Sequence, residues 1–330
     1  MRSRMLAGAL LAAALLAGSA PGQDYPSRPV TLVVPFPPGG PVDVAGRLMA
    51  QALGAPLRQP VVVENQGGGA GGSIGTARVA RAAPDGYTLL AGAPYLPGAP
   101  AFVANLAFDP AADFAPVGLL YSGPAVLMAR NGLALPPGGD GVAAWLRAAG
   151  DRAGFAHAGL GTVPHQCALV LLHRMGAAPT LVSYRGAGPA LQDLLAGTVD
   201  LLCLPLTAAL PAIRAGQARA VLTTGPTRAA LLPEVPTAAE ALPPRGEAGA
   251  EVLQWAGLLA PARTPPAILQ RLNRALSAAL DDPALRARIA ALGAEPFPPA
   301  QRTPEAMAAL MAAEAAAITA AARSMGVRPD

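Results

Sequence analysis

The sequence predicts an α/β fold of two doubly wound lobes joined by two crossing strands, and three observations support this fold class. Short β-branched runs alternate with amphipathic segments, which is typical of parallel sheets covered by helices. The alternation occurs in two separate sets. Two long extended runs, residues 115–130 and 251–261, flank the second set and are long enough to carry the chain from one lobe into the other and back.

The first set of elements lies between residues 29 and 92. The run "PVTLVVPF" predicts a buried strand, and the helix after it has apolar residues at helical spacing up to Gly54, where we expect it to end. The expected strands cover 29–36, 60–65 and 85–92, and the expected helices cover 42–54 and 73–83. This order predicts a βαβαβ arrangement.

The second set follows the first extended run, and a helical tail follows the second. The expected strands are 154–159, 179–186, 199–206 and 218–224, and the helices between them are 164–175, 188–197 and 207–216. The tail helices are expected at 264–282, 283–293 and 303–326. We therefore assign residues 23–124 and 251–330 to a discontinuous first lobe and residues 125–250 to a second lobe.

The N-terminus predicts export from the cytoplasm. A secretory signal peptide has three parts, and all three are present. The basic start is "MRSRM", the apolar core is "LAGALLAAALLAG" and the small-residue exit is "SAPGQD". Cleavage after Ala20 would put Pro21 first in the mature chain, so we expect residues 1–22 to be removed after Gly22. No second apolar run of about 20 residues occurs, so we expect a periplasmic protein without membrane insertion.

The composition argues against several functions. Hydrophobic residues make up 52% of the chain and charged residues 13%, which provides a large core and argues against disorder. Arginine supplies all the positive charge, and a P-loop is excluded because it needs lysine. The net charge of +4 is scattered and aromatic residues are only 4%, so we expect no nucleic-acid partner.

The glycine-rich stretch "VVVENQGGGAGGSIGTARVA" fits a dinucleotide-binding motif. Gly67, Gly69 and Gly72 match G-x-G-x-x-G. This match follows the second strand, whereas the dinucleotide fingerprint follows the first, and Asp85 lies in a turn where the motif needs an acidic residue at a strand end. We therefore expect neither a dinucleotide nor any other cofactor.

Residues 71–75 of the same stretch also fit the G-x-S-x-G elbow of a hydrolase, with Ser73 as the nucleophile. Such an elbow places its serine directly after a strand, whereas eight residues separate the strand end at Glu64 from Ser73. The candidate triad partners fall in the other lobe and are Asp151, His157 and His165. A secreted serine hydrolase is thus the alternative to a binding protein, and capping of the next helix is the simpler role for Ser73.

The spacing of the histidines and cysteines does not predict a metal site. His157, His165 and His173 are spaced by eight residues, and no cysteine or carboxylate cluster completes a zinc shell, so we expect no metal. Cys167 and Cys203 are the only cysteines. In an oxidising compartment they form either a disulfide or two buried thiols, and both alternatives stay open.

Glycine-rich turns before helices predict an anion-binding cleft between the lobes. These turns are residues 39–40, 68–72, 159–161 and 186–188, two from each lobe. Free backbone N–H groups and the helix dipole favour a carboxylate or phosphate, and glycine lets the backbone approach closely. His165 lies at a helix N-terminus, where it is placed to donate to a bound anion. We expect a small carboxylated ligand bound by backbone amides and ordered water.

Several blocks of the chain, in order, resemble the Bug family, the extracytoplasmic solute-binding receptors of tripartite tricarboxylate transporters. The blocks run from Tyr25 to the C-terminal helix and are "YPSRPVTLVVPFPPGGPVDVAGR", "VVVENQGGGAGGSIGTARVARAAPDGYTLL", "GTVPHQCALVLL", "YRGAGPALQDLLAGTVDL", "LPEVPTAAEA" and "WAGLLAPARTPPAILQRLN". The resemblance implies a type II periplasmic-binding-protein fold that closes on its ligand. It also implies carboxylate ligands and solute capture without catalysis.

The resemblance further implies which residues bind the ligand. In the first lobe they are Phe36, Pro37, Gly39, Gly40, Asp43, Gly69, Gly71, Gly72 and Ser73, and in the second they are Gly161, Thr162 and His165. Asp43 matches an acidic position of the family, and capping of the first helix is an equally good role for it.

The chain departs from the family after "VDL", where the family usually shows an aromatic residue and then a polar pair that faces the cleft. Here the run is Cys203, Leu204 and Pro205, and the loop at 93–105 is also unusually apolar. We therefore expect an aromatic or branched acid in preference to an amino acid, whose ammonium group needs a countercharge. The implied partners are membrane transporter subunits or, with the same sequence features, a sensor kinase, and we expect a monomer.

Overall fold

The structure is a computed structural model of the chain and describes residues 25–136, 138–244, 251–327 and 329. The predicted signal peptide, residues 1–22, and its cleavage site after Gly22 lie outside these residues. The predicted lobe boundary at residue 250 also falls outside them, so the domain limits stay a prediction.

A single sheet runs through the molecule in the order β2-β1-β3-β9-β4-β7-β5-β6, with β8 and β10 also paired to β4. The strands are β1 Val30–Val34, β2 Val61–Asn65, β3 Thr88–Gly92, β4 Phe114–Arg130, β5 Gly154–His157, β6 Thr180–Ser183, β7 Leu201–Pro205, β8 Ala218–Thr223, β9 Leu253–Pro261 and β10 Glu295–Pro296. Parallel pairs at each end, β1 with β2 and β3 and β5 with β6 and β7, are typical of βαβ units.

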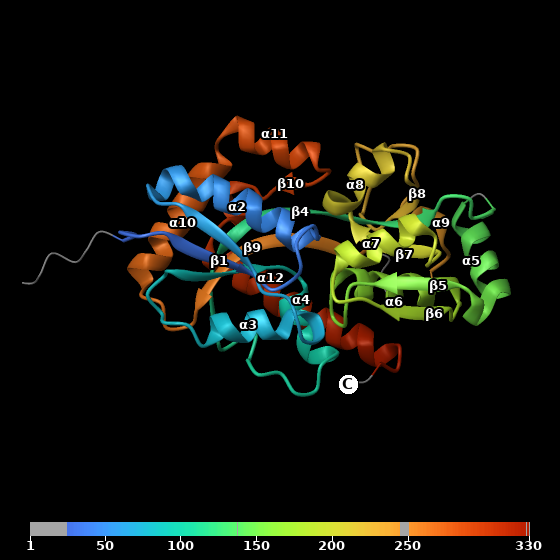
Figure 1. Cartoon of the computed structure of the whole chain (residues 1–330), viewed down its shortest axis with the longest axis horizontal. Coiled ribbons are helices and arrows are strands. Elements are labelled where there is room, and N and C mark those ends of the chain that lie inside the picture. The colour runs from blue at the N-terminus through green and yellow to red at the C-terminus, as the bar shows by residue number, and fades with distance from the viewer. Residues whose placement is uncertain (1–24, 137, 245–250, 328, 330) are drawn as a thin grey trace, which may run out of the picture.

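The two crossing strands, β4 and β9, connect the lobes as the sequence predicts. The first part of β4 pairs antiparallel with β9 up to Pro124, which lies opposite Leu253. From Ala125 onward β4 pairs with β7 and β8 of the second lobe instead. Figure 1 shows α5 to α9 at one end of the molecule, and β4 and β9 leading away from them to the other end. The α/β class with two lobes and two crossing strands is confirmed.

The helices cover both faces of the sheet. They are α2 Pro41–Leu57, α3 Ser73–Ala80, α4 Tyr95–Gly98, α5 Gly138–Ala149, α6 Val163–Met175, α7 Ala187–Ala196, α8 Leu206–Arg214, α9 Ala238–Ala241, α10 Pro266–Leu280, α11 Pro283–Ala291 and α12 Pro304–Ser324. In the first lobe, α2 and α3 lie on opposite sides of the strands in Figure 1. In the second lobe, alternate residues of β7 point into two separate cores, with Leu201 and Cys203 on one side and Leu202 and Leu204 on the other.

The end of α2 differs from the prediction. We expected the helix to end at Gly54, but it continues to Leu57. Arg58, with φ of 55°, is the left-handed residue that ends it, and its N–H donates to the Ala55 carbonyl. Glycine is common just past a helix end, but it is also tolerated inside the last turns, so Gly54 marks the wrong position.

Cys167 and Cys203, whose pairing was open, form a disulfide between α6 and β7. Both residues are fully buried. The bond attaches the helix that follows residues 159–162 to the centre of the second-lobe sheet.

The helix α12, by length and composition alone, is apolar enough to cross a membrane. Here it packs against β4 and α4, and its Met307 and Met311 are buried. The indole Nε1 of Trp255 donates to Glu314 of this helix at 2.6 Å. Burial, partly offset by this bond, raises the pKa of Glu314 to about 7.

Candidate ligand-binding cleft

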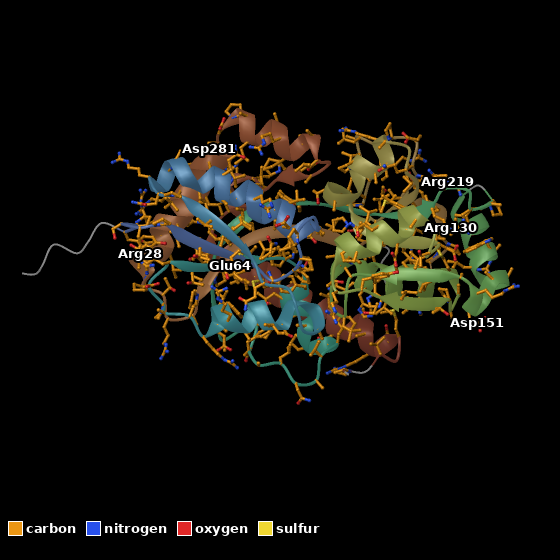
Figure 2. The ribbon with its side chains drawn as sticks, in the orientation of Figure 1. Arg28, Glu64, Arg130, Asp151, Arg219 and Asp281 are labelled. Carbon is orange, nitrogen blue, oxygen red and sulfur yellow. A yellow bond between two sulfur atoms is a disulfide. The ribbon has the colours of Figure 1, made fainter. Side chains whose placement is uncertain are left out.

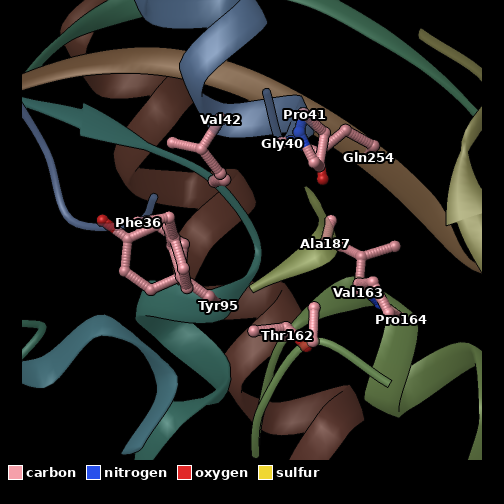
Figure 3. Close-up of a pocket in the computed structure, with 12 residues that line it drawn as sticks. Phe36, Gly40, Pro41, Val42, Tyr95, Thr162, Val163, Pro164, Ala187 and Gln254 are labelled. Atoms are coloured by element: carbon pink, nitrogen blue, oxygen red, sulfur yellow. The ribbon is translucent and has the colours of Figure 1, made fainter. Parts of the chain in front are cut away.

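A cavity of about 30 Å³ lies between the two lobes, where α2 faces α6 and α7. Its wall consists of Phe36, Gly40, Pro41, Val42, Ala93 and Tyr95 from the first lobe, Ala158, Thr162, Val163, Pro164 and Ala187 from the second lobe, and Gln254 from β9 (Figure 3). This volume is too small for an acid of several carbon atoms, so we expect the lobes to separate before a ligand enters.

The N-termini of three helices meet at the cavity. Gly40 is the N-cap of α2 and Thr162 is the N-cap of α6, and Ala187 is the first residue of α7. None of the three helices has a side chain that caps its first N–H groups. The positive ends of three helix dipoles and their free N–H groups favour an anion at this position, and binding of a ligand here stays a prediction.

The glycine turn at residues 68–72 lies beside the cavity rather than in its wall. A Cβ built on Gly71 would lie 2.6 Å from the Leu160 carbonyl oxygen of the other lobe. Among the predicted site residues, those that do not line the cavity are Pro37, Gly39, Asp43, Gly69, Gly71, Gly72, Ser73, Gly161 and His165. Their contact with a ligand stays a prediction, while Phe36, Gly40 and Thr162 do line it.

A second close approach joins the lobes at Gly186. A Cβ on this residue would lie 2.9 Å from Cδ of Pro37 in the first lobe. The backbone at Gly186 is extended, with φ of 166°, so the absence of a side chain and not an unusual backbone is what lets the turns meet. The lobes are therefore in a closed arrangement.

Asp43 holds the turn that precedes α2. It is 4% exposed and accepts hydrogen bonds from the Gly39 N–H at 2.9 Å, from Arg47 Nε at 3.0 Å and from Asn65 Nδ2 at 2.9 Å. Burial works to raise the pKa of Asp43, but these hydrogen bonds hold it below its usual range. The N–H that Asp43 binds belongs to Gly39, before the N-cap Gly40, so Asp43 does not cap the helix but holds the Gly39–Gly40 turn in place.

Asn65 was not predicted from the sequence. Its Nδ2 also donates to the Phe36 carbonyl at 3.1 Å, so the side chain fixes the chain on both sides of the Pro37–Pro38 pair. The sequence did contain an indication of this role, since the strand "VVVEN" ends in polar residues. The carboxyl ends of β1 and β2 are neighbours in a parallel pair, so a polar residue at the end of β2 lies close to the turn that follows β1.

His165 is buried beneath residues 159–162 rather than in the cavity wall. Its Nδ1 accepts from the Gly161 N–H at 3.2 Å, its ring meets Phe102 edge-on at 4.9 Å, and the His157 ring lies 4.7 Å away. Burial, with a smaller effect of His157, lowers the pKa of His165 to about 3. The imidazole is therefore neutral at neutral pH and supports the Gly161 turn.

The structure does not bring the hydrolase triad together. Ser73 begins α3, and Gly72 rather than Ser73 is the N-cap, so the expected capping role of Ser73 is wrong. Asp151 follows α5 at the outer end of the second lobe (Figure 2). Among the described residues, no hydrogen bond links Ser73 to Asp151, His157 or His165.

Cys203, Leu204 and Pro205, at the positions where the family usually carries a polar pair facing the cleft, do not line the cavity. Cys203 is in the disulfide, and Leu204 packs in the core beneath α7 and α8. The positions alternate between the two cores of the sheet, as strand geometry requires.

The wall is nevertheless mostly apolar and carries no charged side chain among the described residues that line it. The rings of Phe36 and Tyr95 meet edge-to-face at 5.0 Å and form one side of it. The Tyr95 hydroxyl donates to the Ala91 carbonyl at 3.1 Å and is thus turned away from a ligand. The cavity suits a small anion with an uncharged body.

Comparisons of the sequence and of the structure with known proteins lead to the same group of proteins. The sequence model described as "Tripartite tricarboxylate transporter family receptor" matches residues 45–322. The chain is 41% identical over 311 residues to the "UPF0065 protein in the TAR-I ttuE-ttuC' intergenic region" of Agrobacterium vitis, covering 93% of this chain and 87% of the relative.

Two solved structures are similar over nearly their whole length. The periplasmic binding protein BugD matches with a TM-score of 0.87 and 36% identity, over 93% of this chain and 100% of BugD. MatC from Rhodopseudomonas palustris, solved with bound malate, matches with a TM-score of 0.85 and 39% identity, over 90% of this chain and 99% of MatC.

Proposed function

This chain belongs to the receptor family of the tripartite tricarboxylate transporters, and on that basis we propose that it captures a small carboxylate in the cavity between its lobes. The family consists of solute-binding receptors and not of enzymes. The observation that carries the proposal is the meeting of three helix N-termini at a cavity whose described lining residues include no charged side chain.

The ligand carboxylate binds at the N-termini of α2, α6 and α7. Their free N–H groups supply hydrogen bonds, and their dipoles supply positive potential without a lysine or arginine. MatC, a relative of similar structure, was solved with malate, which supports a carboxylate as the ligand. Asp43 and His165 act indirectly, because they hold the turns that present the N–H groups.

The rest of the ligand carries no ammonium group. A buried cation needs a partner, and no carboxylate side chain lines the cavity among the described residues. An acid with a neutral body is therefore preferred to aspartate or glutamate.

The protein works in the periplasm, where the binding proteins of this family are found. Residues 1–22 act as the signal peptide, with cleavage after Gly22. After closure, the ligand-loaded monomer is recognised by the membrane subunits of its transporter, or by a sensor kinase if it serves sensing instead of uptake. A pulldown with each candidate partner, with and without ligand, separates these two roles.

A thermal-shift screen of residues 23–330, refolded to remove any carried ligand, tests the proposal. The panel holds malate, adipate, aromatic and branched acids, aspartate, glutamate and nicotinamide. A ligand at about 100 times its Kd adds about 2.7 kcal/mol, which shifts Tm by a few degrees. A shift with acids supports the proposal. Shifts with nicotinamide alone, or with no acid, contradict it, and a preference for aspartate or glutamate contradicts the uncharged body.

A further inference from the structure

The imidazole of His165 lies at a contact between the two lobes. The residue is 5% exposed, and its ring meets the ring of Phe102 edge-to-face, with the centroids 4.9 Å apart. Phe102 precedes β4 in the first lobe, whereas His165 is in the first turn of α6 in the second lobe. A Cβ built on Gly161, in the turn that His165 supports, would also lie 3.3 Å from Cδ2 of Phe102. The closed arrangement therefore holds Phe102 over His165, and separation of the lobes withdraws it.

The hydrogen bond at Nδ1 of His165 leaves no place for a second proton on the ring. Nδ1 accepts from the Gly161 N–H at 3.2 Å, so the neutral imidazole carries its proton on Nε2. A second proton would go to Nδ1 and would face the Gly161 N–H, donor against donor. The charged ring would lose this bond and would be buried without compensation. The closed protein therefore holds His165 neutral.

The titratable groups around His165 do not stabilise its charged form. From β5, the ring of His157 lies 4.7 Å away and would repel a positive charge if it were itself protonated. From α12, Glu314 shares a groove with Phe102, but its carboxyl group accepts from the Trp255 indole at 2.6 Å. Among the described residues, no carboxylate is bonded to His165. The pKa of His165, lowered to about 3 by burial and to a smaller extent by His157, agrees with these contacts.

Separation of the lobes changes this balance. With Phe102 withdrawn, water reaches the imidazole of His165 and solvates its charged form, so its pKa returns toward the ordinary value of about 6.5. A bound carboxylate would attract a proton to His165. However, His165 does not line the cavity, and its Nδ1 is turned to the Gly161 N–H. Burial on closure therefore outweighs attraction to the ligand.

We infer that closure of the lobes on an acid expels a proton from His165, so that the protein binds its acid more tightly at neutral pH than at acidic pH. This inference rests on the proposed function, because capture of an acid drives the closure, and it adds a regulation of the same site by pH. The open form binds the proton near pH 6.5 and the closed form does not. The Kd is therefore expected to be about tenfold larger at pH 5.5 than at pH 7.5.

The chain has three histidines, His157, His165 and His173, so each imidazole can be followed separately. NMR titration of tag-free residues 23–330 with labelled histidine gives the pKa of each ring, without acid and with malate, adipate, 3-methylbutyrate or benzoate. The pKa of His165 is expected to lie near about 6.5 without acid and to fall by more than about one pH unit in the complex. Isothermal titration with the same acids at pH 5.5 and 7.5 measures the change in Kd.

Substitution of His165 links the pH dependence to this side chain. The variant is His165→Gln, with His165→Asn as the second variant if the first unfolds. Neither titrates at this position, so the remaining change in Kd reports ionisation of the acid itself and is expected to be less than about threefold. His173→Gln, at a half-buried position in the last turn of α6, and Glu314→Gln, which removes another group that titrates near pH 7, are the controls and keep the tenfold change.

The outcomes separate this inference from the proposed function. If none of the four acids binds at pH 7.5, the proposed function fails and the inference fails with it. If an acid binds with the same Kd at both pH values or more tightly at pH 5.5, or if His165→Gln keeps the tenfold change, the inference is wrong and the proposed function stands. A change that is lost in His165→Gln and kept in both controls supports both. If neither His165 variant binds an acid, the pKa of His165 in the wild-type complex decides.

Discussion

Glu314 is a single carboxyl group whose burial makes stability depend on pH. Its pKa is raised from 4.5 to about 7, chiefly by burial. Between these two values the folded protein binds more protons than the unfolded chain, so stability falls as pH rises through that window. The loss is complete above pH 7 and absent below pH 4.5. It amounts to about 3 kcal/mol.

Glu314→Gln removes this dependence because the amide is neutral and its oxygen still accepts from the Trp255 indole. We expect the variant to be more stable than the wild type at pH 8 by about 3 kcal/mol and equal to it near pH 4.5. Urea unfolding at both pH values measures the difference, and Glu305→Gln, exposed in the first turn of α12, is the control. Equal stabilities of wild type and Glu314→Gln at pH 8 would show that the carboxyl group is not buried in solution.

Among the individual residues of the site, the sequence predicts the glycine and N-cap residues better than it predicts which side chains line the cavity. Gly40 and Thr162 are found because helix starts have a local signal. Gln254 has none: the run "EVLQWAGLLAP" predicts a strand, but it does not tell whether Gln254 or Trp255 faces the cavity. The sequence places His165 at a helix N-terminus but does not show its burial against Phe102, because that contact comes from a distant loop.

Among the elements, α6 depends on the disulfide that joins it to β7. The bond closes a loop of 36 residues between Cys167 and Cys203. By the loop-entropy relation, such a cross-link stabilises the folded state by about 3 to 4 kcal/mol. The double variant Cys167→Ala with Cys203→Ala is expected to lose this amount in urea unfolding. A reducing agent should destabilise the wild type similarly and leave the variant unchanged. A variant as stable as the oxidised wild type would contradict the prediction.

The alternation of strands and helices was predictable because each element has its own periodicity, whereas α4 and α5 were missed. The α5 segment "GGDGVAAWLRAA" carries three glycines in its first turn, which mask an apolar face formed by Val142, Ala143 and Leu146. The α4 segment contains proline and is only four residues long, too short for a periodic signal. Packing against the rest of the molecule stabilises both.

For the whole molecule, closure depends on how closely the lobes can approach at Gly186. An alanine methyl group would lie 2.9 Å from the rigid ring of Pro37, although the extended backbone accepts alanine. Gly186→Ala is therefore expected to fold normally, to stay more open in small-angle X-ray scattering and to bind its acid at least about tenfold more weakly.

Gly54→Ala is the control for this experiment, because its methyl group would make only an ordinary contact within the first lobe, 3.9 Å from the Gln59 carbonyl. It is expected to close and bind as the wild type does. Unchanged closure and affinity in Gly186→Ala would mean that the lobes of the ligand-bound protein do not meet at Pro37.

The pairing of Pro124 with Leu253 has a consequence for how the gene can be rearranged. The chain leaves the first lobe and returns to it on two neighbouring antiparallel strands, so the polypeptide between them is an insert in an otherwise continuous host. A tight two-residue turn can join such strands directly. We therefore expect the second lobe to behave as a cassette that can be exchanged between relatives at this one junction, with the host strands left in register.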